Sequence, residues 1–575
     1  MAYNRLGTLR YIDTAIAFLK EALELEPKNG EALMQQAECY EGRFHRLAIP
    51  NDITLALDLG TRAYNLMKDT DPRAAKVLGL SWAAKASEYH NTSQQRIDTL
   101  DNAIFLLNKA LKDYDHKDQA LKIEIIFKLG NVIHQKFRSI LHESSEKTNQ
   151  VIKEAISFKK QALSSTRRNH ASKAAEYAAS LGHTHRDRFV NLDNNKKGTN
   201  IYDLKDARKY YEFALENTPV DHPERITRQI GLAIIFKLLY EHSTNELPKR
   251  EYLDRAVRNL REAIASKVGY TLKREQLNAC FHLAMLSQYT AVDLTLEAWS
   301  HAMEFIRDLV WVGLAFEEQK RNLIEIVGVT GDAVAAAIIA KQFGSAMEWL
   351  DQGRAIVWNQ LLVKHTNFKA FPDEPLMVRL AHLAGDLLDS DGAISKGELS
   401  ELNSQKRRRI AEDFDECIKL AQKCSGFEGL MISPTEIDLR KICQNLNSRV
   451  IIINMTKGRC DALSFGDHGV DHVPLGDIYA TITAAWKDLK RILALENLRH
   501  FFPNERNERT PGPSMLSVLR TMWNAVVLPV LTGLGYNVTV GAMAPSQATN
   551  SDIRHCRKSS LWKRRLISLG VQQGP

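Results

Sequence analysis

Residues 100–111 read LDNAIFLLNKAL, with two alanines, Ala103 and Ala110, seven positions apart among apolar residues. Seven residues are two turns of an α-helix, so both alanines lie on one face, and small side chains there let a neighbouring helix approach closely. The first 310 residues repeat this pattern at intervals of roughly 40 to 50 residues. Similar pairs are Ala15/Ala22, Ala56/Ala63, Ala155/Ala162, Ala207/Ala214 and Ala256/Ala263, and Ala298 is followed at the same spacing by Phe305.

A turn signal and a second helical run follow each alanine helix, as in TPVDHPERITRQIGLAIIFKLLY at residues 218–240. Prolines at 27, 72, 219 and 223 lie in or beside such turns, where a helix begins or ends. No stretch before residue 440 alternates apolar and polar residues as a strand does. The sequence therefore predicts a mainly α protein, with an α-solenoid of about seven hairpins over residues 1–345, a terminal helix at 346–365 and a helical connector at 366–447.

The pattern changes after residue 448. RVIIINMT at 449–456 is a continuous β-branched run, which is typical of a strand buried on both faces. RCDALSF and VDHVPL follow as shorter strands, and DIYATITAAWKDLKRILA and SMLSVLRTMWNAVVLPVLTGLG follow as helices. Strands followed by helices predict the start of an α/β domain over residues 448–536.

Composition excludes several classes of protein. With 44% hydrophobic and 25% charged residues, the chain is not wholly disordered, collagen-like or a multi-span membrane protein. Its net charge is +8, but residues 537–575 contribute six basic residues and one aspartate, a net +5, which leaves +3 (8 − 5) for the rest. A nearly neutral body gives no argument for nucleic acid, so no nucleic-acid partner is expected.

The cysteines and the apolar stretches predict a cytoplasmic protein. Seven cysteines without a CxxC pair are typical of reduced thiols. The first 25 residues carry acids and bases through their apolar stretch, unlike a signal peptide. Residues 522–540 are apolar, but Asn524, Pro529 and two glycines favour a buried helix over a membrane span, so no membrane partner is expected.

These repeats resemble a known type. The alanine pair, the turn with an acidic residue and proline, and the apolar second helix resemble tetratricopeptide repeats, with loops longer than in the usual unit of about 34 residues. Three basic–phenylalanine pairs close second helices, at residues 43–44, 136–137 and 188–189. This variant is similar to the repeats of a large fungal family in which the array precedes a caspase-like domain called CHAT. The segment AMEWLDQGRAIVWNQLL at 346–362 resembles the helix that ends that array, with Met347, Leu350, Ile356, Trp358 and Leu361 expected to face inward.

Residues 448–536 resemble the opening of the CHAT domain. The resemblance implies a cysteine endopeptidase, in which the thiolate of a Cys after a later strand attacks a peptide carbonyl and a His after an earlier strand acts as general base and then acid. In that family an aromatic strand and a Leu-Pro-x-His motif follow, whereas this sequence continues as NVTVGAMAPSQATNSDIRHCRKSSLWKRRLISLGVQQGP. We therefore expect a truncated CHAT domain without the dyad, and a basic, disordered tail at 537–575. A reading-frame change or a retained intron is our hypothesis for that tail.

No residue is predicted to be catalytic, cofactor-binding or metal-binding, and no cofactor is expected. Cys460 has His468 and His472 nearby in sequence, but it lies in the first hairpin of the sheet, where a structural thiol is favoured. His555 and Cys556 are adjacent only in the tail. His183 and His185 diverge if they lie on a helix. The sequence contains no zinc-ligand spacing, GxGxxG or Walker loop.

Two further segments imitate binding motifs. LDSDGAISKGEL at 387–398 resembles a calcium loop, but Leu387 stands where the first oxygen ligand belongs, so a polar loop between helices is predicted. The basic run at 406–409 could contact nucleic acid, but acids at 412, 413 and 415 follow it, which favours a solvated helix face.

Three functions are compatible with the sequence. The first is a scaffold that binds a protein or peptide on the concave face of the array. The second is the cysteine endopeptidase that the family resemblance implies, regulated by its repeats. The third is a basic tail that binds a membrane surface or nucleic acid, because Trp562 and Leu566 lie among its charged residues. The sequence favours the scaffold, because the dyad motifs are missing.

Overall fold

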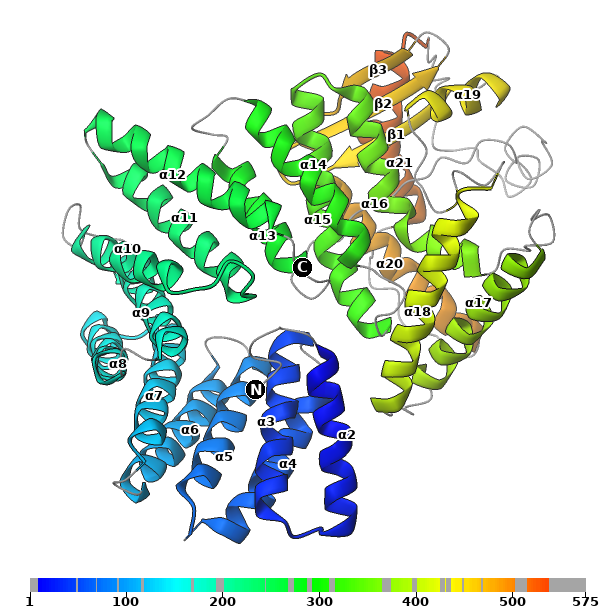
Figure 1. Cartoon of the computed structure of the whole chain (residues 1–575). Coiled ribbons are helices and arrows are strands. Elements are labelled where there is room, and N and C mark those ends of the chain that lie inside the picture. The colour runs from blue at the N-terminus through cyan, green and yellow to red at the C-terminus, as the bar shows by residue number, and fades with distance from the viewer. Residues whose placement is uncertain are drawn as a thin grey trace. The chain divides into compact units, whose positions relative to one another are not determined.

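A computed structural model gives the fold of the chain (Figure 1). It describes residues 9–47, 50–68, 70–89, 93–114, 118–166, 170–192, 201–243, 245–266, 273–286, 292–309, 316–364, 374–395, 401–424, 430, 436–446, 449–466, 469–501 and 514–536. Two compact units are present, one of Met1–Glu318 with Ser390–Arg409 and one of Gln319–Asp389 with Ile410–Pro575.

The first unit is a stack of helical hairpins. The first helices of the hairpins are α2 (Leu9–Leu25), α4 (Pro50–Met67), α6 (Gln94–Asp113), α8 (Ser145–Ser165), α10 (Ile201–Glu216), α12 (Glu246–Ala265) and α14 (Val292–Leu309). The second helices are α3 (Gly30–Leu47), α5 (Pro72–Lys85), α7 (Gln119–Ser139), α9 (Ala171–Leu192), α11 (Glu224–His242) and α13 (Lys273–Met285). Each helix packs on the next one in the chain, from α2 to α14. The predicted α-solenoid is confirmed.

The alanine pairs lie in the first helices and face the core. The pairs on α4, α6, α8, α10 and α12 have no exposed surface, and on α14 Ala298 and Phe305 are buried. The prediction is wrong for the first pair, because Ala15 is half-buried and Ala22 is exposed. On α2, Ile12 and Ile16 pack into the core instead, so that helix uses a different face.

Glycines in the second helices complete these contacts. A carbon at the Cβ position would lie 3.2 Å from the Ala103 carbonyl oxygen at Gly79, 3.3 Å from that of Ala155 at Gly130, and 3.1 Å from that of Ala207 at Gly182. The first alanine of each of these pairs therefore faces a glycine on the second helix before it, and the two backbones almost touch. Side chains larger than these would separate the hairpins.

Tyr211 lies between two second helices. A carbon at the Cβ position would lie 2.8 Å from its Cδ2 atom at Gly182 on α9, and 2.4 Å from its Cε1 atom at Gly231 on α11. The ring belongs to α10 and is buried. Both glycines are thus required by the close approach of one aromatic ring.

The second unit contains helices around a small sheet. Its helices are α15 (Phe316–Ile339, whose first three residues belong to the first unit), α16 (Phe343–Lys364), α17 (Glu374–Ser395, whose residues from Ser390 belong to the first unit), α18 (Glu401–Ala421, whose residues up to Arg409 belong to the first unit), α19 (Glu436–Leu446), α20 (Tyr479–Phe501), α21 (Met515–Met522) and α22 (Leu528–Gly533), with a π-helical turn at Trp523–Val527. Its strands are β1 (Val450–Met455), β2 (Cys460–Gly466) and β3 (Gly469–Pro474), paired antiparallel in the order β1-β2-β3. In the terminal helix α16, Met347 and Leu350 are buried as predicted, and the side chains of Ile356, Trp358 and Leu361 lie outside the described residues.

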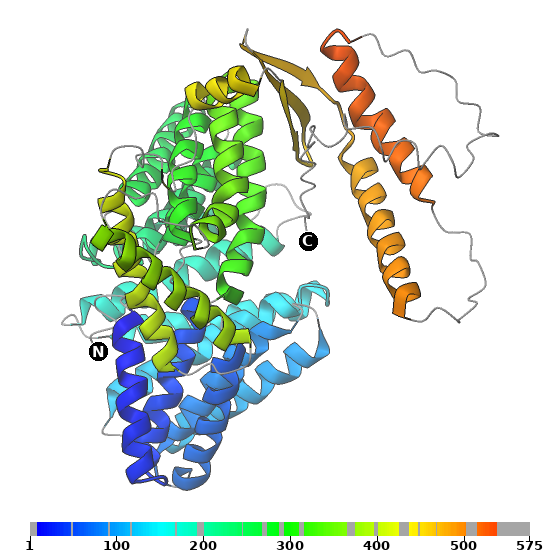
Figure 2. The same cartoon turned by 90° about the vertical axis from the view of Figure 1, so that its right-hand side faces the viewer.

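The sheet lies between two helical layers (Figure 2). On one face Ile453, Cys460 and Val473 pack with Val526 and Val530 of the helices that follow. On the other face the Asn454 amide donates to the carbonyl oxygen of Gly331 on α15, at 3.1 Å. The central strand β2 is buried along its length, whereas the N-terminal half of β1 is only half-buried. The prediction of β1 as a doubly buried strand therefore holds for Ile453–Met455 but not for Val450–Ile452.

Two predicted segments of the connector differ from the structure. Residues 387–395 continue helix α17, not a loop, because Leu380, Ala384 and Leu387 form a buried stripe at helical spacing. In the basic run, Arg407 is buried, so the prediction of a wholly solvated face is wrong at that residue. Arg407 shares the packed stripe of α18 with Ala411 and Phe414.

The apolar helix at 515–533 is not buried as predicted. Only Val518, Val526 and Val530 are buried, and Leu516 and Leu519 are 66% and 54% exposed. By length and composition this stretch could cross a membrane, although one such helix in the described part of the chain is weak evidence for a span. Residues 537–575 lie outside the described residues.

Candidate binding surface

The second helices of the array approach one another directly. Helix α3 contacts α5, α5 contacts α7, α7 contacts α9, α9 contacts α11 and α11 contacts α13. In a curved stack, the elements on the inner side approach one another most closely. The second helices therefore line the inner side, and Figure 1 shows α9 and α11 there, with α8 and α12 outside. We call the solvent-facing sides of α3, α5, α7, α9, α11 and α13 the inner face.

Polar contacts between successive second helices cross the inner face. The Arg73 guanidinium of α5 pairs with Glu31 of α3 at 2.7 Å. Lys76 of α5 pairs with Glu38 of α3 at 3.2 Å and with Glu124 of α7 at 2.8 Å. These ion pairs join three hairpins, so the charges on this part of the inner face neutralise one another.

Two of the basic–phenylalanine pairs anchor second helices to the hairpin that follows. Arg43 donates to both carboxylate oxygens of Asp52 on α4, at 2.7 and 2.8 Å. Arg188 holds Asp203 on α10 in the same two-pronged way, with its Nε atom 2.7 Å from Oδ2. Both aspartates are buried, and a guanidinium fork matches a carboxylate in this geometry. In both cases the arginine at the C-terminal end of a second helix thus holds the first helix of the following hairpin in place.

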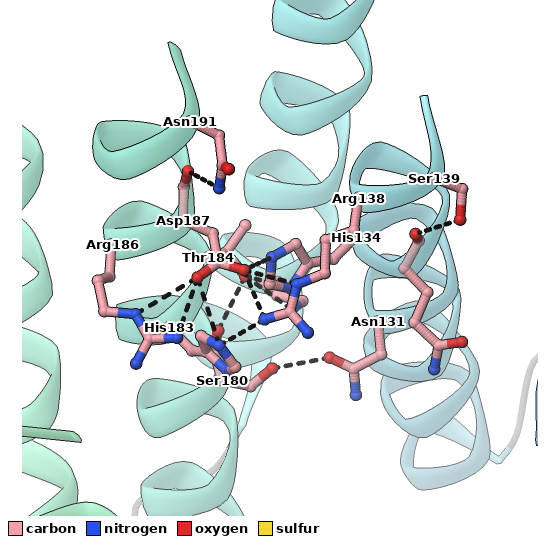
Figure 3. Close-up of polar contacts among 12 residues, drawn as sticks. Asn131, His134, Arg138, Ser139, Ser180, His183, Thr184, Arg186, Asp187 and Asn191 are labelled. Carbon is pink, nitrogen blue, oxygen red and sulfur yellow. Dashed lines mark hydrogen bonds and ion pairs between the residues drawn. The ribbon is translucent and has the colours of Figure 1, made fainter. Parts of the chain in front are cut away.

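A larger cluster surrounds Asp187 on α9 (Figure 3). Its carboxylate accepts from Arg138 Nε at 2.7 Å and from Arg186 Nη2 at 3.0 Å, and it lies 3.1 Å from His134 Nε2. His183, one turn before Asp187 on the same helix, lies 3.4 Å away. Burial alone would raise the pKa of Asp187, but the hydrogen bonds from the histidines and the nearby Arg138 charge outweigh it and hold that pKa well below its ordinary value.

Lys159 of α8 supports this cluster from the core. Its Nζ atom donates to Thr184 Oγ1 at 2.7 Å and lies 3.3 Å from His134 Nδ1. Burial, and then the Arg138 charge, lower the pKa of Lys159 to about 7. Burial and the Lys159 charge lower the pKa of His134 to about 3. His134 is therefore neutral, and the bonding pattern assigns its proton to Nε2, which donates to Asp187, while Nδ1 accepts from Lys159.

The cluster carries more positive than negative charge. Arg138, Arg186 and Lys159 surround one carboxylate, that of Asp187. Within the part of the chain that the structure describes, neither arginine pairs with a second acid. The Arg138 side chain is 43% exposed, so its charge reaches solvent, whereas burial lowers the pKa of His183, whose side chain is 37% exposed. We call Arg138, His183 and Arg186 the basic patch.

Charged residues on neighbouring helices add to the positive electrostatic potential around the basic patch. Arg96 of α6 lies within electrostatic range of Arg138, and it donates only to a hydroxyl and a backbone carbonyl among the described residues. Burial, then the Lys237 and Arg186 charges, lower the pKa of His282 on α13 to about 4. The positive potential therefore extends from α7 and α9 towards α11 and α13.

The two histidines of the LGHTHRDRF segment point to different partners, as expected for a helix. His183 belongs to the basic patch, whereas His185 is buried with its Nδ1 atom 2.7 Å from Asp203 Oδ1. Sequence reasoning missed Arg138, Lys159 and Asp187. The spacing of His134 with Arg138 and of His183 with Asp187, four residues apart on consecutive second helices, was the available signal.

Cys460 and His472 lie on opposite faces of the sheet. The Cys460 thiol packs into the core beneath the following helices, 3.7 Å from the Thr456 carbonyl oxygen. His472 lies on the other face, with its Nε2 atom 2.6 Å from Asp461 Oδ1 and its ring stacked on Phe343. Burial raises the pKa of Cys460. This thiol and this imidazole therefore do not form a catalytic pair.

The other residues considered from the sequence lie elsewhere. His468, His555 and Cys556 fall outside the described residues. Among the residues that are described, no group of three or more His, Cys, Asp or Glu side chains is placed to hold a metal ion.

Comparison with known proteins gives remote structural similarities. No family model and no curated protein matches the chain. The C-terminal part of a TPR repeat-containing protein from Cytophaga hutchinsonii matches at 12% identity over 52% of this chain and 95% of that one, with a TM-score of 0.29. Nro1, a hypoxic regulator of sterol synthesis described as a nuclear import adaptor, matches at 12% over 60% and 97%, with a TM-score of 0.31. IFIT1, solved with a capped RNA, matches at 11% over 60% and 76%, with a TM-score of 0.28.

Proposed function

We propose that this protein is an interaction scaffold of the tetratricopeptide type, which binds a segment of a partner protein along its inner face. One observation carries the proposal: six second helices touch in series and present their polar sides to solvent on one side of the stack. Stacked hairpins create extended surfaces of this kind, which suit a peptide or a protein segment.

The contacts beneath this surface make it rigid. Glycines on the second helices meet alanine backbones, and arginine–aspartate pairs fix two second helices, α3 and α9, to the hairpin that follows. A rigid surface loses little conformational entropy when it binds, so more of the contact energy appears as affinity. The array therefore offers a preorganised site.

The described thiols do not favour the cysteine-peptidase alternative. Burial raises the pKa of Cys39 to about 11 and that of Cys280 to about 12, and Cys460 is buried on the face of the sheet opposite His472. A nucleophilic cysteine requires the opposite shift and an adjacent base. The caspase-like domain stays a prediction from the sequence, and a cysteine-directed activity probe tests it.

Matched charge reversals test the scaffold. Peptides that bind the intact chain are first selected from a random display library, and their affinities are measured by fluorescence anisotropy. Lys128→Glu on α7 and Glu176→Lys on α9 alter the inner face, whereas Lys153→Glu and Glu154→Lys alter the exposed side of the first helix α8.

We expect at least one inner-face reversal to change the affinity of a selected peptide by roughly tenfold, and both α8 reversals to leave it within about twofold. Binding that responds only to the α8 reversals would contradict the proposal. Failure to select any peptide from a diverse library would contradict it too.

A further inference from the structure

We infer that the basic patch selects an acidic partner segment, one whose Asp or Glu side chains pair with Arg138 and Arg186. This inference rests on the proposed function and names the chemistry of the partner. It starts from an imbalance of charge on α7 and α9 that the rest of the inner face does not share.

The imbalance can be followed atom by atom. Oδ2 of Asp187 accepts from Arg138 and His134, and Oδ1 accepts from Arg186, so both oxygens of this carboxylate are engaged. Arg138 has further contacts only with His183, and Arg186 has none beyond Asp187, among the residues that the structure describes. Each guanidinium carries five N–H donors, and several therefore remain available to a ligand.

Uncompensated charge at a partly buried site is costly. The charges of Arg138 and Arg186 outnumber that of Asp187, and the Arg186 side chain is only 20% exposed. Charges in such surroundings are normally paired. On the neighbouring part of the inner face they are, since Arg73 and Lys76 of α5 have three carboxylate partners on α3 and α7. A carboxylate from a partner would complete the pairing here, and it would match the planar fork of arginine.

Two observations favour an acidic peptide over a nucleic acid. A strand of RNA bound without sequence preference needs aromatic side chains on which its bases stack. The aromatic rings of α7 and α9 are all buried, namely Phe127, Phe137, Tyr177 and Phe189. In addition, Glu176 is exposed on α9. It would repel a polyanion that followed the stack, whereas a short acidic segment contacts only the patch.

The test uses the peptides selected on the intact chain. We expect them to be enriched in Asp and Glu relative to the unselected library, and to bind more weakly as the salt concentration rises. Arg138→Gln and Arg186→Gln should each weaken binding by roughly tenfold, whereas Arg138→Lys, which keeps the charge but loses the fork, should weaken it less. Arg62→Gln, on the exposed side of first helix α4, is the matched control and should have no effect.

The possible results of these binding experiments distinguish the acidic-segment inference from the scaffold proposal. Selected peptides that are neutral or basic, or that bind the two Arg→Gln variants normally, overturn the acidic-segment inference and leave the scaffold standing. Peptides that ignore every inner-face change overturn the scaffold itself. A single-stranded oligouridylate that binds more tightly than the peptides, and loses affinity in the same variants, overturns the inference in favour of RNA. Circular dichroism of each variant shows whether the helices are intact.

Discussion

The Gly231→Ala variant tests the stacking of hairpins most sharply. The added methyl would lie 2.4, 2.6 and 2.8 Å from the Cε1, Cζ and hydroxyl oxygen atoms of Tyr211. The ring cannot withdraw freely, because its other side faces Gly182 on α9. One of the two helices must therefore move, and the hairpins must separate.

The expected magnitude follows from two opposed effects. Overpacking of a well-packed core costs about 1–3 kcal/mol, and distances this short place the cost at or above the upper end. Alanine gains about 1 kcal/mol over glycine within a helix. We expect the free energy of unfolding of this part of the array to fall by about 2 kcal/mol.

Gly42→Ala is the matched control on second helix α3. The nearest atom to its added methyl is Ile12 Cδ1 at 3.7 Å, an ordinary van der Waals contact. This variant should therefore be stabilised, by up to about 1 kcal/mol. Hydrogen exchange of peptides from α3, α10 and α11 reports the local opening free energy in each variant.

A double-mutant cycle identifies the cause. Tyr211→Leu removes the ring, so combining it with Gly231→Ala should cost at least about 1 kcal/mol less than the sum of the two single changes. The reasoning is refuted if Gly231→Ala is as stable as Gly42→Ala, or if the two changes at the Tyr211 contact are additive.

Three further predictions concern buried polar groups. Asp203→Asn should destabilise the array by about 3 kcal/mol in urea denaturation, because Arg188 and the buried His185 lose the charge of their carboxylate partner, whereas Asp206→Asn, at a 48% exposed side chain, should be nearly neutral. The pKa of Lys159 falls from 10.5 to about 7 on folding, so the native chain becomes more stable as the pH rises between those values. The stability advantage of Lys159→Met over the unchanged chain should therefore shrink over that range, by up to about 4 kcal/mol. A difference in the hydrogen exchange of α7–α9 that does not depend on pH would disprove the burial of this charge. Iodoacetamide at neutral pH should alkylate Cys424 before Cys460, and mass spectrometry showing the reverse order would indicate a reactive thiol in the sheet.

Much of the fold follows from local sequence. Alanines two turns apart mark a helix face that must be approached closely, and five of the pairs are fully buried. The rule fails at Ala15 and Ala22 because α2 uses Ile12 and Ile16 for its core face. The glycines opposite the alanines were also readable, since Gly79 precedes Ala103 by 24 residues and Gly130 precedes Ala155 by 25 (103 − 79 and 155 − 130).

Other features depend on tertiary context. The resemblance of 387–398 to a calcium loop suggests a loop, but helix α17 continues to Ser395, past the buried residues Leu380, Ala384 and Leu387. The β-branched run of β1 suggests a strand buried on both faces, but its first three residues are only half-buried. Local propensity does not determine either outcome.

The basic patch could not be located from sequence alone. His134 and Asp187 are 53 residues apart, and only the stacking of α7 on α9 brings them together. The four-residue spacings on each helix indicate two polar stripes, but not that they face each other. Nor does the sequence show that one carboxylate must serve two arginines and a lysine.

Site-specific photocrosslinking tests the binding surface most directly. Benzoylphenylalanine at residue 131, on the inner face of α7, is compared with the same group at residue 153, on the exposed side of α8, each in the presence of one selected peptide. We predict a covalent adduct with the peptide from position 131 and none from position 153. An adduct from position 153 alone would show that partners bind the outer side of the stack and would contradict this account.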